Sequence, residues 1–362
     1  MPPDSGPSIR IDLKKLLLVL GIGVPILIVD HIYSIESGRE AYHAAVADYL
    51  ETLAVTAAGA AEALVEDSIA QAQALAARPD VIALAKSSYA EHRGRDEGEL
   101  AVPDKVWQTP EAEPIVDRIV SHPVALILRE EIGRDPSIVQ VVLADRAGPT
   151  AAASLKPTLY YQGDRSWFTI AVGDGRNGAV HVGQPHHDTP TDRTVFEVGV
   201  PVVDPDEARV VGALLVTVDT QSFVGLLTRA LAGSSGRASV VTSEGRMIAA
   251  SPVSASREAD SPEFAAIRPE ADAGSRWAQV DGDRERLIAY ARTSLGARFR
   301  DADWYLLISQ DGLEVNEPIR RITTRELVSA AVAILLVIVL AVYFAAHRRI
   351  DVDPLHDIEQ AE

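Results

Sequence analysis

The sequence predicts an α+β protein with a long N-terminal helix, two small α/β modules in tandem, and a transmembrane helix on either side of them. Three observations predict this arrangement. Uncharged apolar segments lie near both termini, an alanine- and glutamate-rich stretch follows the first of them, and β-branched runs separated by turn residues fill the remainder. Of the 362 residues, 47% are hydrophobic and 24% are charged, which is enough for a packed core.

The strongest membrane signal is the segment 327–346, which has 20 residues and no charge. At 1.5 Å per residue, a helix of this length spans about 30 Å, the thickness of the hydrocarbon layer of a bilayer. The N-terminal segment 16–35 is a weaker candidate, because its uncharged run is shorter and contains Pro25. A cleaved signal peptide is the alternative for this segment, although no small-residue cleavage site follows the run directly.

Basic residues flank both segments on the terminal side, which predicts that both termini are cytoplasmic and that the chain between them is extracytoplasmic. The last 16 residues hold no recognisable output domain, and residues 349–362 resemble the start of a HAMP linker helix. We therefore expect either a fragment of a longer receptor or a chain that acts through a separate cytoplasmic partner. The expected divisions are 1–15 (cytoplasmic), 16–35 (first span), 36–90 (stalk helix), 91–232 (membrane-distal module), 233–312 (membrane-proximal module), 313–346 (helix entering the second span) and 347–362 (cytoplasmic tail).

The segment 36–77 is predicted to be one helix, because it is rich in helix-forming residues and contains no proline. The sequence Arg78-Pro79-Asp80 should end it. A helix this long needs a packing partner, either its own domain or a second copy of the chain. A homodimer is therefore expected.

Strands are expected where β-branched runs occur, and the two modules repeat one pattern of strand, acidic glycine turn and strand. The expected strands are 138–143, 179–183, 194–203 and 210–219 in the first module, and 238–242, 246–250, 276–280, 285–291 and 304–310 in the second. A helix is expected at 223–231. The acidic residues Glu97, Glu99, Glu111 and Glu113 lie among prolines and are predicted to be in solvated loops.

Charge and cysteine content exclude several functions. The formal net charge is −18, so nucleic-acid binding is not expected, because it relies on cations that neutralise phosphates. The chain has no cysteine, which excludes disulfides, iron–sulfur clusters and thiolate zinc sites. The sequence also lacks Walker, kinase, serine-hydrolase and zinc-protease motifs, so neither a cofactor nor enzymatic activity is expected.

One stretch of the first module carries a specific resemblance. Tyr160-Tyr161-Gln162-Gly163-Asp164-Arg165-Ser166-Trp167-Phe168 is followed by Pro185-His186-His187-Asp188 and then by Val216-Thr217-Val218-Asp219. These motifs and the layout of residues 36–320 resemble the double Cache family of bacterial extracytoplasmic sensor domains, closest to its amino-acid-binding and amine-binding branch. The resemblance implies PAS-like modules and a location in the bacterial inner membrane.

The resemblance also implies a ligand site in the membrane-distal module. Arg165, with backbone near Trp167, would hold a ligand carboxylate, and Asp188 and Asp219 with Tyr160 would hold an ammonium. Phe168 and His186 stand where that branch has tyrosine, so an amine or a small carboxylate stays open beside an amino acid. The implied site residues are Tyr160, Arg165, Trp167, Phe168, His186, Asp188 and Asp219.

The function implied is a membrane-anchored sensor that binds a small extracytoplasmic ligand and passes a helix shift across the membrane. Two alternatives remain. One is a structural protein that docks a partner without any ligand. The other is an extracytoplasmic metal-dependent enzyme, because imidazole and carboxylate groups suit zinc or copper. Its ligands would be His181, His186, His187 and Asp188.

Overall fold

The computed structural model describes residues 13–188, 191–231, 233–252, 260–280, 282 and 284–346. The predicted tail 347–362 and the first 12 residues lie outside the described residues. The chain divides into two compact units. Residues 1–46 and 313–362 form one unit, and residues 47–312 form the other.

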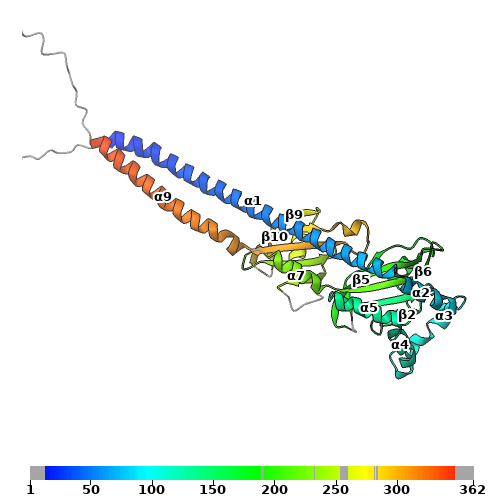
Figure 1. The fold of residues 1–362 in the computed structure, drawn as a ribbon. Helices are drawn as coiled ribbons and strands as arrows, with labels where there is room; N and C mark the ends of the chain where they lie inside the picture. The colour runs from blue at the N-terminus through cyan, green and yellow to red at the C-terminus, as the bar shows by residue number, and fades with distance from the viewer. Residues whose placement is uncertain are drawn as a thin grey trace, which may run out of the picture. The chain divides into compact units, whose positions relative to one another are not determined.

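The first unit is built from the start of α1 (Leu13–Ala76) and nearly all of α9 (Gly312–Ala346), drawn blue and orange-red in Figure 1. The two helices pair there. A Cβ placed on Gly23 would lie 3.5 Å from Val337, and His43 Nε2 lies 2.8 Å from Asn316 Oδ1. Both helices are long and apolar enough to cross a membrane. Leucines and isoleucines of both helices are largely exposed.

The second unit begins with the rest of α1, which ends at Ala76 as the Arg78-Pro79-Asp80 sequence predicts. Pro79 then occupies the first turn of α2 (Pro79–His92), where its missing N–H costs nothing. Short helices follow up to the first strand. They are α3 (Glu97–Leu100), η1 (Val102–Val106), η2 (Pro110–Ala112), α4 (Glu113–Val120) and α5 (Pro123–Arg134).

The prediction that Glu97, Glu99, Glu111 and Glu113 lie in loops is wrong, because each is in one of these short helices. Helix-start signals explain the difference. The Asp96 side chain accepts a hydrogen bond from the Glu99 backbone N–H at 2.9 Å, which caps α3, and prolines occupy the first turns of the helices that follow.

Each module contains one antiparallel sheet, and the two sheets share a strand order. The first sheet runs β2-β1-β6-β5-β3, with β4 also paired to β5. Its strands are β1 (Ile138–Asp145), β2 (Thr150–Ala153), β3 (His181–Val182), β4 (His186–Asp188), β5 (Arg193–Asp204) and β6 (Arg209–Asp219), with helix α6 (Ser166–Val172) between β2 and β3. All nine expected strands are present, and the α+β prediction is confirmed.

The second sheet runs β8-β7-β11-β10-β9. Its elements are β7 (Arg237–Thr242), β8 (Met247–Ser251), α8 (Pro262–Ile267), β9 (Ala273–Val280), β10 (Arg284–Arg292), η3 (Ser294–Ala297) and β11 (Trp304–Asp311). Helix α7 (Gln221–Arg229) connects the sheets, and its Phe223 packs against Phe196 of β5 and Trp304 of β11. The three rings are fully buried, with centroids 5.7 to 5.9 Å apart. This aromatic cluster joins the two modules.

Candidate ligand-binding site

A row of polar side chains crosses the three central strands of the first sheet. Gln140 of β1 and Glu197 of β5 both pair with Thr217 of the strand between them, β6. Residues directly opposite each other in neighbouring strands place their side chains on the same face of a sheet. The sequence therefore brings an amide, a hydroxyl and a carboxylate together from segments far apart in the chain.

The next row on this face is apolar and is covered by α6. In this row, Val142 of β1 and Gly199 of β5 both pair with Leu215 of β6. A Cβ on Gly199 would lie 3.0 Å from the backbone oxygen of Trp167, so only glycine lets α6 approach this closely. Trp167 then packs with Val142 and Leu215 in a core cluster. The helix thus covers the apolar row and leaves the polar row open.

A cavity of about 410 Å³ lies over the polar row, within the range typical of small-molecule sites. Its lining includes Gln140, Thr217, Val142 and Leu215, together with residues of the segment 157–162. Charged and titratable side chains from the α6 start, from β4 and from β5 complete it. These are Asp164, Arg165, His186, His187, Asp188 and Glu197.

Glu197 is the most perturbed group of the cavity. Burial raises the pKa of its carboxyl above the ordinary value, and the negative charge of Asp188 adds to the rise. The His186 ring and the Arg165 guanidinium act in the opposite direction, and His186 Nε2 lies 3.9 Å from Glu197 Oε1. A cation brought in by a ligand would favour the ionised form of this carboxyl and so act against the effect of burial.

Four of the seven residues predicted for the site line this cavity, namely Arg165, Trp167, His186 and Asp188. The Asp188 carboxylate is half-buried and accepts hydrogen bonds from the hydroxyl and the backbone N–H of Thr191, at 2.5 Å and 3.2 Å. Arg165 is exposed, and no ion pair holds its guanidinium within the described part of the chain. Its donors are therefore open to an anion.

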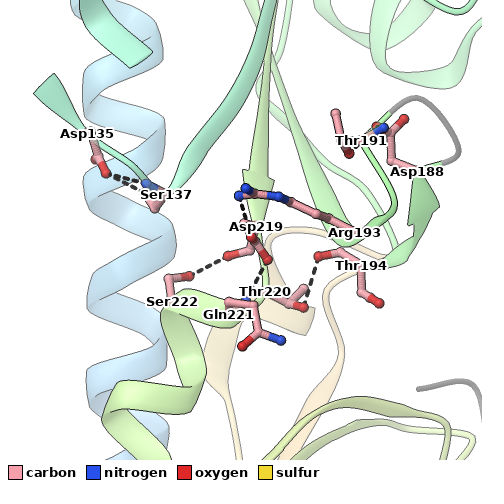
Figure 2. Close-up of polar contacts among 10 residues, drawn as sticks. All are labelled: Asp135, Ser137, Asp188, Thr191, Arg193, Thr194, Asp219, Thr220, Gln221 and Ser222. Atoms are coloured by element: carbon pink, nitrogen blue, oxygen red, sulfur yellow. Dashed lines mark hydrogen bonds and ion pairs between the residues drawn. The ribbon is translucent and has the colours of Figure 1, made fainter. Parts of the chain in front are cut away.

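Asp219 does not line the cavity and has partners of its own, as Figure 2 shows. Its Oδ2 forms an ion pair with Arg193 Nη1 at 2.9 Å, and its Oδ1 accepts a hydrogen bond from the Gln221 backbone N–H at 2.8 Å. The Asp219 side chain is 7% exposed and that of Arg193 is 50% exposed. Asp219 thus anchors the start of α7 and binds a cation of the chain itself.

Tyr160 and Phe168 also lie outside this cavity. Phe168 is buried in the core under α6 and meets Trp167 edge to face, with ring centroids 5.7 Å apart. Tyr160 is 4% exposed, packs against Trp107 at 5.6 Å and lines a different, smaller cavity. Ligand contact by Tyr160, Phe168 and Asp219 stays a prediction.

The histidines proposed as metal ligands are spread over separate environments. His181 is buried, and burial lowers the pKa of its ring. His186 faces Glu197, and His187 Nε2 lies 3.5 Å from Asp192 Oδ1. Across the residues that the structure describes, no three metal-ligating side chains come together.

Glu197, Gln140 and Thr217 were missed in the sequence. Each is a polar residue with an apolar residue on either side in its strand, as in Val-Phe-Glu-Val and Ile-Val-Gln-Val. That interruption of a β-branched run is a usable signal. Only the strand register shows that the three interruptions meet.

The chain is similar to several solved structures. The ligand-binding domain of the Campylobacter jejuni chemoreceptor Tlp3, in complex with 4-methylisoleucine, is 16% identical, with a TM-score of 0.49 over 77% of this chain and 95% of that one. The corresponding domain of Pseudomonas fluorescens CtaA, in complex with L-isoleucine, is 15% identical, with a TM-score of 0.49 over 77% and 98%. That of Pseudomonas aeruginosa PctB, in complex with L-Arg, is 17% identical, with a TM-score of 0.48 over 75% and 97%.

No curated protein sequence matches the chain. The family described as Cache domain (dCache_1) matches residues 38–319, which is more than half of the chain and includes both sheets. The resemblance found in the sequence is therefore confirmed. This chain belongs to the Cache domain family, dCache_1.

Proposed function

We propose that the chain is a membrane-anchored, non-catalytic sensor whose first module binds a small extracytoplasmic ligand, with an amino acid as the first candidate. The observation that supports this most directly is the charge arrangement of the 410 Å³ cavity. A guanidinium with free donors, Arg165, shares the cavity with the carboxylates of Asp188 and Glu197. A zwitterion complements both signs.

The carboxylate of the ligand would bind Arg165. A guanidinium offers a planar fork of donors that matches a carboxylate, and such charge-assisted pairs are roughly twice as strong as neutral hydrogen bonds. Gln140 and Thr217 add neutral hydrogen-bonding groups between the charged ends. The apolar wall of Trp167, Val142 and Leu215 can receive an aliphatic side chain.

The ammonium of the ligand would bind near Glu197 and Asp188. A cation beside Glu197 favours its ionised form and so offsets the burial that raises its pKa. Asp219 contributes only after Arg193 is displaced, because the two already form an ion pair. The amino acids bound by Tlp3, CtaA and PctB belong to those proteins; for this chain the ligand class is inferred from the cavity.

Transmission would start from the first module and end in α9. The aromatic cluster Phe196, Phe223 and Trp304 connects the two sheets, and β11 ends at Asp311 directly before α9. A ligand shifts such a system only if it binds the two states with different affinity, and helix displacements of about 1–2 Å are typical of such switches. The proposal includes two membrane spans, a homodimer and a cytoplasmic partner that reads the output.

The test is thermal unfolding of the full chain in detergent micelles against a panel of amino acids, amines and small carboxylates. A ligand at 100 times its Kd adds about 2.7 kcal/mol, which shifts the Tm of a protein of this size by roughly 3–5 °C. The variant Arg165→Gln should abolish the shift given by amino acids. Arg176→Gln is the matched control, because Arg176 is an exposed arginine outside the cavity.

The compounds of this panel distinguish the proposed amino-acid sensor from the alternative functions. Stabilisation by amino acids that needs both Arg165 and Glu197 supports the zwitterion site. Stabilisation by amines alone, unaffected by Arg165→Gln, removes the carboxylate role of Arg165. If no compound stabilises the wild-type chain, the sensor proposal fails and the partner-docking alternative takes its place.

A further inference from the structure

We propose that the first module holds a second site, specific for a small oxyanion, in a cavity separate from the ligand cavity. This anion cavity has a volume of about 220 Å³ and lies between α2, the end of α4, the start of α5 and β2, which are labelled together in Figure 1. Its volume is below the typical range for drug-sized ligands, which favours a phosphate or a short carboxylate.

Arg118 and Tyr160 supply the first donors. Both line the cavity, and the Arg118 guanidinium lies close enough to the Tyr160 hydroxyl to act on the pKa of that phenol. Burial raises the pKa of Tyr160 and outweighs the opposite effect of Arg118, so the phenol stays protonated and neutral. A guanidinium has five N–H donors, so most of them remain available to an anion.

His122 is held in the tautomer that donates to the cavity. Its Nδ1 accepts a hydrogen bond from the Val124 backbone N–H at 3.1 Å, which caps α5. A ring nitrogen that accepts carries no proton, so the proton of the neutral ring is on Nε2. Because His122 lines the cavity, its Nε2–H is a donor available to an occupant.

His92 is the most buried charged or titratable side chain of the lining apart from Tyr160. Its Nδ1 lies 2.7 Å from Oδ2 of Asp145, which is fully buried. Asp145 also accepts from Ser88 Oγ at 2.6 Å and from the Ala147 backbone N–H at 2.7 Å. No hydrogen bond to His92 Nε2 occurs among the described residues, although the residue is only 9% exposed. Because Nδ1–H donates to the Asp145 carboxylate, Nε2 of the neutral ring is an acceptor and adds no donor for an anion.

The donors around the cavity favour an anion. Arg118, Tyr160 and His122 offer N–H or O–H groups, whereas Glu91 is the single lining carboxylate; Arg118 and Glu91 are both exposed. The Asp145 carboxylate lies behind His92 and is satisfied by three hydrogen bonds. An oxyanion bound to Arg118 can also accept from Tyr160 and His122, whereas a cation would have only Glu91 and one imidazole nitrogen.

The anion cavity shares a wall with the ligand cavity. Four residues of the segment 157–162 line the ligand cavity, and Tyr160 of the same segment lines the anion cavity. Hydrogen bonds fix the backbone of this segment at Pro157 and at Tyr160 and Tyr161. Asp104 accepts from the backbone N–H groups of Tyr160 at 2.6 Å and Tyr161 at 3.1 Å, and Trp107 Nε1 donates to the Pro157 oxygen at 2.8 Å.

The experiment is thermal unfolding of the full chain in detergent micelles against inorganic phosphate and against acetate, with ionic strength held constant by chloride. The expected result is saturable stabilisation by at least one of the two anions. Arg118→Gln should weaken that anion at least about tenfold, the loss expected for a charged hydrogen bond. Glu91→Gln should strengthen it, because it removes the opposing carboxylate. Arg176→Gln should leave it unchanged.

His122→Asn is the second variant, because asparagine keeps the helix cap but removes the Nε2 donor. It should weaken the anion severalfold while the chain stays folded. Stabilisation no greater than that given by chloride overturns the site, as does full retention of binding in Arg118→Gln and His122→Asn. Arg165→Gln should preserve the anion response, so a failure of the ligand cavity and a failure of the anion cavity give different results.

Discussion

The aromatic cluster between the two modules allows a quantitative prediction. Phe223 of α7 lies between Phe196 of the first sheet and Trp304 of the second, with centroid distances of 5.9 and 5.8 Å. All three side chains are 0% exposed. The variant Phe223→Ala removes the ring that contacts both sheets and leaves a cavity at the junction of the modules.

The magnitude follows from burial. A fully buried phenylalanine that becomes alanine costs about 3–5 kcal/mol, from lost transfer energy and from the cavity left behind. That range includes the ring–ring contacts, which are worth about 0.5–1.5 kcal/mol per pair. For a protein of this size, each kcal/mol lowers the Tm by about 1–2 °C, so a loss of roughly 4–8 °C is expected for a mid-range cost.

The assay is thermal unfolding of the full chain in detergent, followed by circular dichroism and by tryptophan fluorescence, which reports Trp304 among the four tryptophans. Tyr49→Ala is the control, because Tyr49 is 56% exposed on α1 and its loss should cost less than about 0.5 kcal/mol. If Phe223→Ala costs less than about 1 kcal/mol, the cluster does not hold the modules together and the reasoning is refuted.

Three further predictions concern the first module. Burial raises the pKa of Glu197, so the free energy of unfolding of the wild type should fall as pH rises from the ordinary glutamate pKa to the raised pKa of the folded state. Above that pH range, Glu197→Gln should be the more stable protein in urea titrations, and equal stability of the two proteins would contradict the pKa shift. Gly199→Val should cost about 1–3 kcal/mol in the same titration, because its Cβ meets the Trp167 backbone, and a neutral result would mean that α6 moves freely. Arg193→Gln leaves the Asp219 carboxylate without its cation and should cost about 1 kcal/mol, a small value because Arg193 is half exposed; no loss would show that the ion pair is fully screened.

Much of the fold was predictable because its strands carry local signals. Residues 194–203 and 210–219 are rich in β-branched side chains, and the turn sequence Asp204-Pro205-Asp206-Glu207 lies between them. The two strands form a hairpin, as predicted. The helices around residues 97–113 were missed because their signals are single capping residues and prolines rather than apolar periodicity. Such short helices depend on packing against the rest of the module.

The site was predictable only where one local stretch supplies it. Arg165 and Trp167 lie together at the start of α6, and His186 and Asp188 lie together on β4. Glu197 reaches the cavity through the register of β5 on β6, and a shift of one residue would turn its side chain to the other face. The engagement of Asp219 by Arg193 is likewise a contact between two strands and leaves no mark in the sequence.

The segment 157–162 has a consequence for what the module reports. It forms part of the wall of two cavities and is anchored by Asp104 and Trp107. With both cavities occupied, the two occupants border the same backbone segment, and thermodynamic linkage requires any effect of one on the binding affinity of the other to be mutual. An anion that changes the affinity for the ligand by some factor has its own affinity changed by that factor. With both proposed sites occupied and coupled, the module would respond to the joint presence of two solutes, and its sensitivity to either would depend on the concentration of the other.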